Sequence, residues 1–181
     1  MRRSVPASKL LLTGPPKIGK STVIARLVQL LHERGIAAGG FVTHEQREHE
    51  RRVGFVVQDL AGQEVAVIAH QDYDTGIQVG RFGVDVPAFE RVGLPALHRA
   101  IEQGGILVID EIARMELASP AFVKVVEQVI DGPLAVVASV HLRADPFTDA
   151  LKRRPGVALL TVTEANRDAL PLQLLERLTT A

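Results

Sequence analysis

Strand-like and helix-like patterns alternate along most of the chain. Runs of strand length, most of them continuously hydrophobic, lie at residues 9–13, 37–43, 106–109, 134–140 and 157–162. Continuous hydrophobicity is typical of parallel strands that are covered on both faces. Amphipathic helical patterns separate these runs, at residues 20–34, 87–103, 120–130, 146–153 and 164–178. The alternation predicts an α/β fold with a mostly parallel sheet and helices on both of its faces.

One segment, at about residues 45–70, interrupts this alternation. It begins with a densely charged run over residues 45–52, which cannot be core, and continues with two strand-like segments at 53–59 and 64–70. The four residues Leu60–Gln63 between them predict a hairpin turn, so we expect an antiparallel hairpin insertion. The glycine-rich, polar residues 72–84 that follow predict an irregular loop. We expect residues 1–181 to form a single domain that carries this excursion.

Composition excludes several classes of protein. Lysine plus arginine equals aspartate plus glutamate at 21 each, and this zero net charge argues against a general nucleic-acid binder. The chain has no cysteine, which excludes disulfides and thiolate metal sites. No apolar run approaches the length of a membrane span, and none follows the two N-terminal arginines as in a secretory signal. We therefore expect a cytoplasmic protein with no membrane partner, and a monomer.

The most informative motif lies between the first predicted strand and the first predicted helix. Residues 14–21 read Gly-Pro-Pro-Lys-Ile-Gly-Lys-Ser, which is a complete G-x-x-x-x-G-K-[ST] phosphate-binding loop. Its glycines let successive backbone N–H groups turn toward a phosphate, and the following helix adds the positive end of its dipole. The residues expected to bind the nucleotide are Gly14, Pro15, Pro16, Lys17, Ile18, Gly19, Lys20, Ser21 and Thr22. Among them, Lys20 would reach the β- and γ-phosphates and the Ser21 hydroxyl would bind Mg²⁺.

A second signature stands at the end of the apolar run 106–109, where Asp110 and Glu111 follow. Asp110 can hold Mg²⁺ near the Ser21 hydroxyl, and Glu111 can orient and deprotonate a water molecule for attack on the γ-phosphate. The pair therefore favours hydrolysis over transfer to another substrate. The alternative is that Asp110 only caps a following helix.

The acidic pair also carries a prediction about the sheet. It places strand 134–140 between the phosphate-loop strand and the acidic strand, so that Ser139 or His141 would face the γ-phosphate. Charge on the transferring phosphoryl group normally needs a further cation. Arg114, Arg47 and Arg143 are candidates. We assign a catalytic role to Arg114, because it lies three residues past the expected general base.

Five segments occur in a familiar order: Gly14–Thr22, Gly39–Arg47, Arg52–Phe55, Asp110–Leu117 and Asn166–Asp168. This order resembles the small P-loop nucleoside-triphosphatases of thermophiles (the THEP type), whose vertebrate members are called cancer-related nucleoside-triphosphatases. The resemblance implies a compact RecA-like domain that slowly hydrolyses several nucleoside triphosphates with Mg²⁺, with the two acids serving the metal and the water. Lys17 stands where the family usually has glycine, and Ala113-Arg114 replace Gly-Lys.

The leading hypothesis is hydrolysis of ATP, GTP, CTP and UTP to diphosphate and phosphate. Two alternatives stay open: a nucleotide-dependent switch or assembly factor, and a kinase for nucleotides or other small molecules. Base preference is not readable, since no N-K-x-D guanine motif is present. Asn166–Asp168 would contact a base or cap the last helix, and Thr43, Glu45 and Arg47 fall in a family motif without an assigned role.

Overall fold

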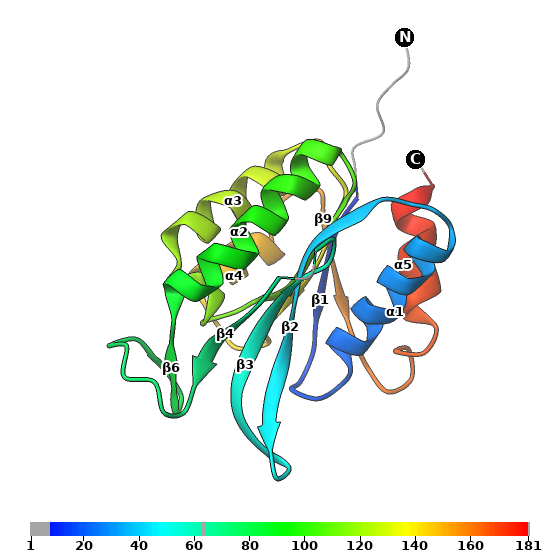
Figure 1. Cartoon of the computed structure of the whole chain (residues 1–181). Coiled ribbons are helices and arrows are strands. Elements are labelled where there is room, and N and C mark those ends of the chain that lie inside the picture. The colour runs from blue at the N-terminus through cyan, green and yellow to red at the C-terminus, as the bar shows by residue number, and fades with distance from the viewer. Residues whose placement is uncertain (1–7, 63, 181) are drawn as a thin grey trace.

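A nine-stranded sheet with helices on both faces forms the molecule, as a computed structural model of residues 8–62 and 64–180 describes it (Figure 1). The strand order is β5-β6-β4-β3-β2-β7-β8-β1-β9. The strands are β1 (Lys9–Thr13), β2 (Ala38–Glu48), β3 (Arg51–Asp59), β4 (Val65–His70), β5 (Gln78–Val79), β6 (Phe82–Val84), β7 (Ile106–Ile112), β8 (Val136–Val140) and β9 (Val157–Thr161). The helices are α1 (Lys20–Glu33), α2 (Val86–Gln103), the 3₁₀ turn η1 (Glu116–Ala118), α3 (Pro120–Asp131), α4 (Pro146–Lys152) and α5 (Leu170–Thr179).

The sheet has a parallel half and an antiparallel half. Strands β2, β7, β8, β1 and β9 pair in parallel, whereas β3, β4, β6 and β5 join through antiparallel pairs. Strand β8 lies between β1 and β7, so the predicted insertion between the phosphate-loop strand and the acidic strand is confirmed. The carboxyl ends of the parallel strands therefore bring the loop after β1 and the acids of β7 to one edge of the sheet.

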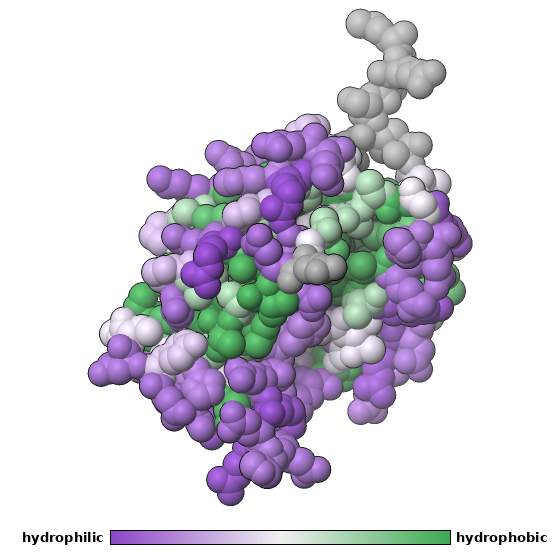
Figure 2. Space-filling view, viewed as in Figure 1, coloured by the Kyte–Doolittle hydropathy of each residue, from purple (hydrophilic) through white to green (hydrophobic). Residues whose placement is uncertain are grey.

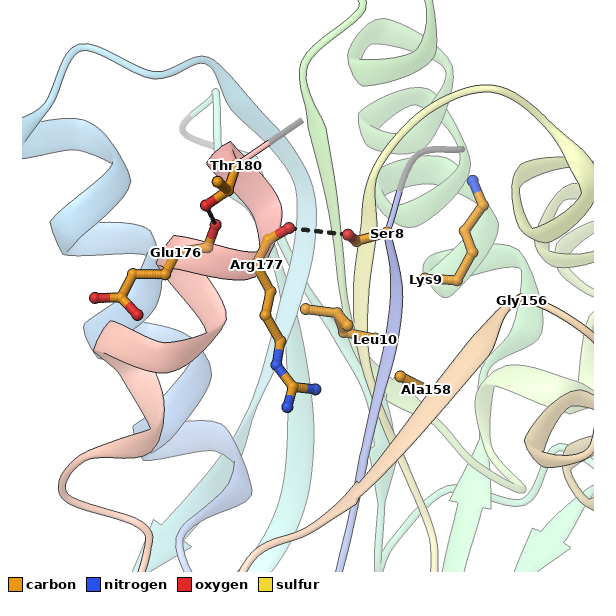
Figure 3. A pocket seen from close by; sticks show the side chains of 8 residues that line it. All are labelled: Ser8, Lys9, Leu10, Gly156, Ala158, Glu176, Arg177 and Thr180. Carbon is orange, nitrogen blue, oxygen red and sulfur yellow. Dashed lines mark hydrogen bonds between the residues drawn. The ribbon is translucent and has the colours of Figure 1, made fainter. Parts of the chain in front are cut away.

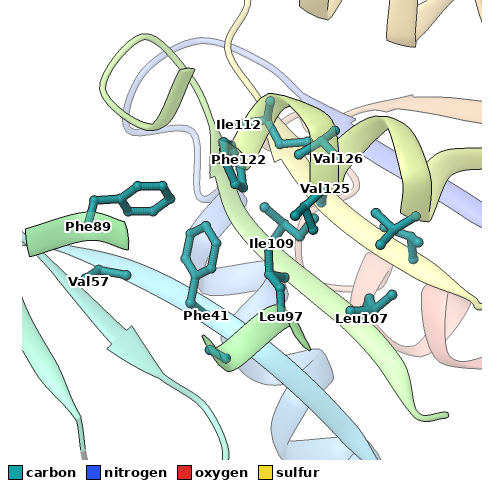
Figure 4. Packing of buried hydrophobic residues seen from close by; sticks show 14 of the residues in the cluster. Phe41, Val57, Phe89, Leu97, Leu107, Ile109, Ile112, Phe122, Val125 and Val126 are labelled. Atoms are coloured by element: carbon teal, nitrogen blue, oxygen red, sulfur yellow. The ribbon is translucent and has the colours of Figure 1, made fainter. Parts of the chain in front are cut away.

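Two hydrophobic layers hold the helices on the sheet. Helices α2, α3 and α4 cover one face, and α1 and α5 cover the other (Figure 1). At the centre of the first layer, the fully buried rings of Phe41, Phe89 and Phe122 pack with centroids 5.2–5.8 Å apart (Figure 4). Edge-on and tilted aromatic contacts of this kind add to the energy of burial. This packing fixes β2 and β7, from which the site is built.

The charged run at residues 45–52 belongs to a second hairpin. It forms the end of β2 and the start of β3, with His49 and Glu50 as the turn, and it projects at the bottom of Figure 1. The space-filling view shows this tip as a hydrophilic protrusion (Figure 2). Glu45 on β2 forms ion pairs with Arg47 and, across the hairpin, with Arg52, so opposite charges face each other on this exposed part of the strands.

Several boundaries differ from those the sequence predicts. Strand β7 does not end at the acidic pair but continues to the buried Ile112, which pairs with Val140 after a register shift. The predicted irregular loop at 72–84 contains β5 and β6, because Phe82 and Val84 bury their side chains beside Ala69 of β4. Of the predicted turn Leu60–Gln63, residue Gln63 lies outside the described residues.

The last helix begins later than predicted, at Leu170 instead of residue 164. The Asn166 side chain accepts a hydrogen bond from the Thr163 amide at 2.8 Å and donates one to the Thr161 carbonyl at 2.9 Å. These bonds hold the segment in a turn, and Pro171 then suits the first turn of α5 because it needs no amide donor there.

Candidate functional site

The loop between β1 and α1 has the backbone that phosphate binding requires. Gly14 and Gly19 have φ values of 151° and 113°, which side chains strongly disfavour. A Cβ on Gly14 would lie 3.0 Å from the Val162 carbonyl oxygen. Lys17 also has a positive φ, of 66°, a backbone conformation that favours glycine. Helix α1 begins directly after Gly19, so its first-turn amides face the same space.

This loop forms one wall of a cleft of about 890 Å³. The cleft is lined by Gly14, Pro16, Lys17, Gly19, Lys20, Ser21 and Thr22 from the loop and α1, by Thr43, His44, Glu45, Arg52, Phe55 and Val79 from β2, β3 and β5, by Glu111, Ala113, Arg114, Met115 and Glu116, and by His141, Leu142 and Arg143. The predicted residues Pro15, Ile18 and Asp110 are not among its lining. The predicted phosphate loop and the predicted base Glu111 therefore meet in one cleft.

Asp110 lies behind the cleft wall, 1% exposed, at the carboxyl end of β7. Its Oδ1 accepts a hydrogen bond from the Ser139 hydroxyl, and among the described residues its buried Oδ2 has no partner. Burial raises the pKa of Asp110, and the Ser139 and Ser21 hydroxyls and the Lys20 charge oppose that rise. Asp110 is part of a strand and caps no helix, so the alternative interpretation of this residue is wrong.

These atoms fit a magnesium ion. No group of three or more histidine, aspartate or glutamate side chains in the described part of the chain could hold a metal alone. Magnesium, however, commonly takes one or two carboxylates and completes its shell with phosphate oxygens and water. The unpartnered Oδ2 of Asp110 and the neighbouring Ser21 hydroxyl are suitable oxygen donors. Ser139 bonds Asp110 and does not face the phosphate site as a sensor.

Glu111 faces the cleft beside the loop. Burial raises the pKa of this carboxyl, the Lys20 ammonium lowers it, and the Asp110 charge raises it further. Lys20 itself donates to the Gly14 carbonyl at 3.2 Å, which holds its ammonium group at the loop. A carboxyl with a raised pKa next to a phosphate loop is suited to accept a proton.

The structure adds an acid that the sequence reasoning left without a role. Glu116 is 4% exposed, lines the cleft, and has a buried Oε2 without a hydrogen-bond partner among the described residues. Burial, and then the Glu111 and Asp110 charges, raise the pKa of Glu116 well above its usual range. The available signal was an acid between Met115 and Leu117, in a segment that resembles a family motif.

The three candidate arginines lie in different settings. Arg114 and Arg143 line the cleft, and within the described residues neither has a carboxylate partner within 4 Å. Arg47 is not a lining residue, because its guanidinium bonds the Glu45 carboxylate at 2.7 Å and the Glu50 carbonyl at 3.1 Å. His141 lines the cleft and its Nε2 lies 3.1 Å from the Thr148 hydroxyl. Burial lowers the pKa of His141. The Asp145 charge opposes this shift, and the Lys152 and Arg114 charges add to it.

The segment Asn166–Asp168 lies on the other flank of the loop. Asn166 organises its own turn and caps no helix, because α5 begins at Leu170 with no side-chain cap bond. Arg167 extends to the phosphate loop, where its guanidinium donates to the Ile18 carbonyl at 3.3 Å. Among these three residues, Arg167 is thus the one that reaches the phosphate loop.

Sequence comparison covers almost the whole chain. Residues 9–175 match the protein family described as NTPase. The chain belongs to this family. It is 37% identical over 167 residues to the nucleoside-triphosphatase THEP1 of Thermotoga maritima, covering 92% of this chain and 93% of that protein. It is 42% identical to the protein of the same name from Thermofilum pendens, over 93% of each chain.

Solved structures of this NTPase family have the same fold. The crystal structure of THEP1 from Aquifex aeolicus superposes with a TM-score of 0.85 at 32% identity, covering 94% of this chain and 99% of that one. The solution structure of a human cancer-related nucleoside triphosphatase gives 0.83 at 29% identity, covering 97% and 99%. The P-loop α/β fold and the nucleoside-triphosphatase class are therefore confirmed.

A second hollow lies at the opposite end of the strands. It has a volume of about 510 Å³ and is lined by Ser8, Lys9, Leu10, Gly156, Ala158, Glu176, Arg177 and Thr180 (Figure 3). The Ser8 hydroxyl donates to the Arg177 carbonyl at 2.9 Å across it. Since it opens at the start of β1, it shares no residue with the phosphate loop. Among the described helices, none is long and apolar enough to cross a membrane.

Proposed function

We propose that this nucleoside-triphosphatase hydrolyses ATP, GTP, CTP and UTP to diphosphate and phosphate, and that it depends on Mg²⁺. The observation that carries the proposal is the position of Glu111 in the same cleft as the complete phosphate loop, with Lys20 close enough to influence its pKa. We further propose that the whole chain acts as one domain and as a monomer.

Each residue has a role that follows from its position. The amides after Gly14 and Gly19 bind the phosphates, and Lys20 neutralises charge on the β- and γ-phosphates. Glu111 accepts a proton from a water molecule while the water oxygen bonds the γ-phosphorus and the bond to the bridging oxygen breaks. Arg114, which lines the same cleft, would neutralise charge on the transferring group. Ser21 and Asp110 would hold Mg²⁺, which when bound would supply further neutralisation of the phosphate oxygens.

The side of the phosphate loop on which the nucleoside would lie carries Arg167, and this supports tolerance among bases. With its γ-phosphate toward the proposed base Glu111, the substrate would place its nucleoside on the side of β9 and Arg167. A guanidinium plane can stack on any base, because every base has a π face. The N-K-x-D guanine motif is absent from the sequence, which removes one route to base selection.

The test is phosphate release from ATP, GTP, CTP and UTP with Mg²⁺ and no other protein, for the wild type beside Glu111→Gln. We expect multiple turnovers on several bases, and a loss of about 10²–10⁴-fold in the variant, the usual contribution of a general base. Nucleotide affinity should stay near that of the wild type, because glutamine retains the shape of the cleft wall.

Two results would contradict the proposal. Normal turnover by Glu111→Gln would remove this residue as the base and leave Asp110 or His141 to be tested. Tight nucleotide binding without turnover in the wild type would favour the alternatives, a nucleotide-dependent switch or a kinase that lacks its acceptor.

A further inference from the structure

The cleft continues past the end of the triphosphate. Strand order places β9 and Arg167 on one side of the phosphate loop and β8, β7, β2 and β3 on the other. In the proposed function the γ-phosphate points toward Glu111 on β7, so the nucleoside of the substrate would lie on the β9 side. The lining residues from β2, β3 and β5 therefore lie beyond the γ-phosphate, in space that the substrate itself does not need.

Apolar side chains form the walls of this part of the cleft. They are Phe55 of β3, Val79 of β5 and Met115, which precedes η1. Phe55 packs edge-on against Phe82 with ring centroids 5.3 Å apart, and the Arg52 guanidinium lies 5.2 Å from its ring centre. The walls are thus supported from behind by packed aromatic and cationic groups, as in a preformed site for a flat organic molecule.

The charged groups at this end of the cleft bond one another. Glu45 bonds the Arg47 guanidinium at 2.7 Å and the Arg52 guanidinium at 2.8 Å. Although burial favours the neutral acid, these hydrogen bonds lower the pKa of Glu45 and keep it ionised within its ion pairs. One carboxylate between two guanidiniums leaves this cluster a net charge of +1, so the inference of an uncharged occupant rests on the apolar walls.

One polar group at this end remains to be explained. Glu116 lines the cleft. Its Oε2 atom is buried and has no hydrogen-bond partner in residues 8–62 and 64–180. A buried polar atom without a partner lowers stability, so native proteins rarely keep one without a reason. Burial raises the pKa of Glu116 well above its usual range, which favours the protonated form, and a protonated carboxyl has both a donor and an acceptor.

We propose that these residues form a second ligand subsite beyond the γ-phosphate, and that it binds an uncharged nucleoside or a similar planar N-heterocycle. Glu116 offers a paired donor and acceptor to the polar edge of the heterocycle, while Phe55, Val79 and Met115 cover its faces. The proposal uses the proposed function only for the direction in which the triphosphate lies.

The experiment is a calorimetric titration of adenosine, guanosine, cytidine and uridine into the protein. The phosphate loop is first saturated with Mg²⁺ and a non-hydrolysable triphosphate, so that a nucleoside cannot bind there. We expect saturable binding of at least one nucleoside. Because this readout needs no turnover, it separates failure of the subsite from failure of the proposed hydrolysis.

Variants test the assignment of residues. Glu116→Gln keeps an uncharged donor and acceptor and should retain binding, whereas Glu116→Leu should weaken it by about tenfold or more through the lost hydrogen bonds. Affinity for the triphosphate should not change in either variant. The same substitution at an exposed position, Glu102→Leu on α2, is the matched control and should bind like the wild type. Should Glu116→Leu fail to fold, Val79→Asp tests the apolar wall from a partly exposed residue.

Three outcomes would overturn the proposal. In the first, no nucleoside binds while the loop is filled. In the second, nucleosides bind only when the triphosphate is omitted, which would place them in the substrate site. In the third, binding is equal in the wild type and in the Glu116→Leu and Val79→Asp variants.

Discussion

Glu116 occupies the least favourable environment of the carboxyls at this site. It is 4% exposed, shares its surroundings with Glu111 and Asp110, and leaves one oxygen unpaired among the described residues. Removing a carboxylate from water favours its protonated form. A residue that lowers stability at neutral pH and still lies in the functional cleft is better explained by ligand binding than by folding.

The cost of Glu116 should depend on pH. Its folded pKa is raised above the ordinary value of 4.5, so its contribution to stability is complete below that pH and is lost as pH rises through the folded pKa. We expect Glu116→Gln to unfold like the wild type near pH 4.5, and to become more stable than it at higher pH. The difference should be about 1.4 kcal/mol for each unit by which the pKa is raised.

Urea denaturation across this pH range measures the difference in free energy of unfolding. The exposed Glu102→Gln on α2 is the control, and its difference from the wild type should not grow with pH. A Glu116→Gln curve parallel to that of the wild type would mean that the folded protein holds this carboxyl ionised.

At the scale of elements, the β2–β3 hairpin has an unusual turn. Both turn residues, His49 and Glu50, have positive φ values, of 46° and 65°. Two-residue turns of this kind suit asparagine and glycine, since other residues pay about 1–2 kcal/mol in the left-handed region. Glu50→Gly should therefore raise the free energy of unfolding by about 1 kcal/mol.

The control for this change is Glu48→Gly, one residue before the turn in strand β2. Glycine there relieves no positive φ and should cost about 0.5–1 kcal/mol through backbone entropy. If the turn is strained, chemical denaturation should show a higher free energy of unfolding for Glu50→Gly than for the wild type, and a lower one for Glu48→Gly. Equal losses in the two would show that Glu50 has no strain to relieve.

Two glycines separate torsional strain from steric clash. Gly35 after α1 has a φ of 66° and open space around the position of a Cβ, whereas Gly40 in β2 has a φ of 121° and a Cβ there would lie 2.1 Å from the Val108 carbonyl oxygen. Gly35→Ala should cost about 1 kcal/mol from torsion alone. Gly40→Ala should cost about 3 kcal/mol or more, because it also forces β2 away from β7.

Denaturation midpoints for the two variants test this ordering. The comparison needs no third variant, because each alanine substitution removes a glycine with positive φ and only one adds a clash. A smaller loss for Gly40→Ala than for Gly35→Ala would mean that the β2–β7 pairing adapts at little cost.

Local patterns predict the parallel half of this fold well and the antiparallel half poorly. Buried strands such as β1 and β8 read as apolar runs, and the phosphate loop joins β1 to α1 as expected. Strand β6 was missed because three residues that pair with β4 carry no periodic signal of their own. The late start of α5 was missed because the bonds of Asn166 replace helical hydrogen bonds over residues that have helical periodicity.

The candidate site also has a part that local sequence predicts and a part that it does not. Its phosphate loop and acidic pair are continuous in the sequence, so spacing alone identifies them. The far wall draws Phe55, Val79 and Met115 from three segments that only the tertiary fold brings together. Glu116 has ordinary chemistry in the sequence, and only its burial without a partner distinguishes it.

At the scale of the whole molecule, separate hydrophobic clusters support the two ends of the cleft. Ile18 of the loop packs against the layer of α1 and α5, while Met115, Phe55 and Val79 pack against the small cluster around Phe82 at the other end. A ligand that bridges these walls ties the parallel and antiparallel halves together. Binding should then stabilise the entire fold against unfolding, beyond any ordering of the loop.

This linkage predicts the thermal behaviour of the protein. A triphosphate analogue with Mg²⁺ at about one hundred times its Kd should add about 2.7 kcal/mol, which for a chain of this length raises Tm by about 5–10 °C. Lys20→Ala should lose most of that shift, and a chelator should reduce it in the wild type. Lys124→Ala, which removes an exposed lysine from α3, should keep it in full. An equal shift in the Lys20 and Lys124 variants would mean that the analogue binds outside the phosphate loop, because only a ligand held by Lys20 can lose affinity through its removal.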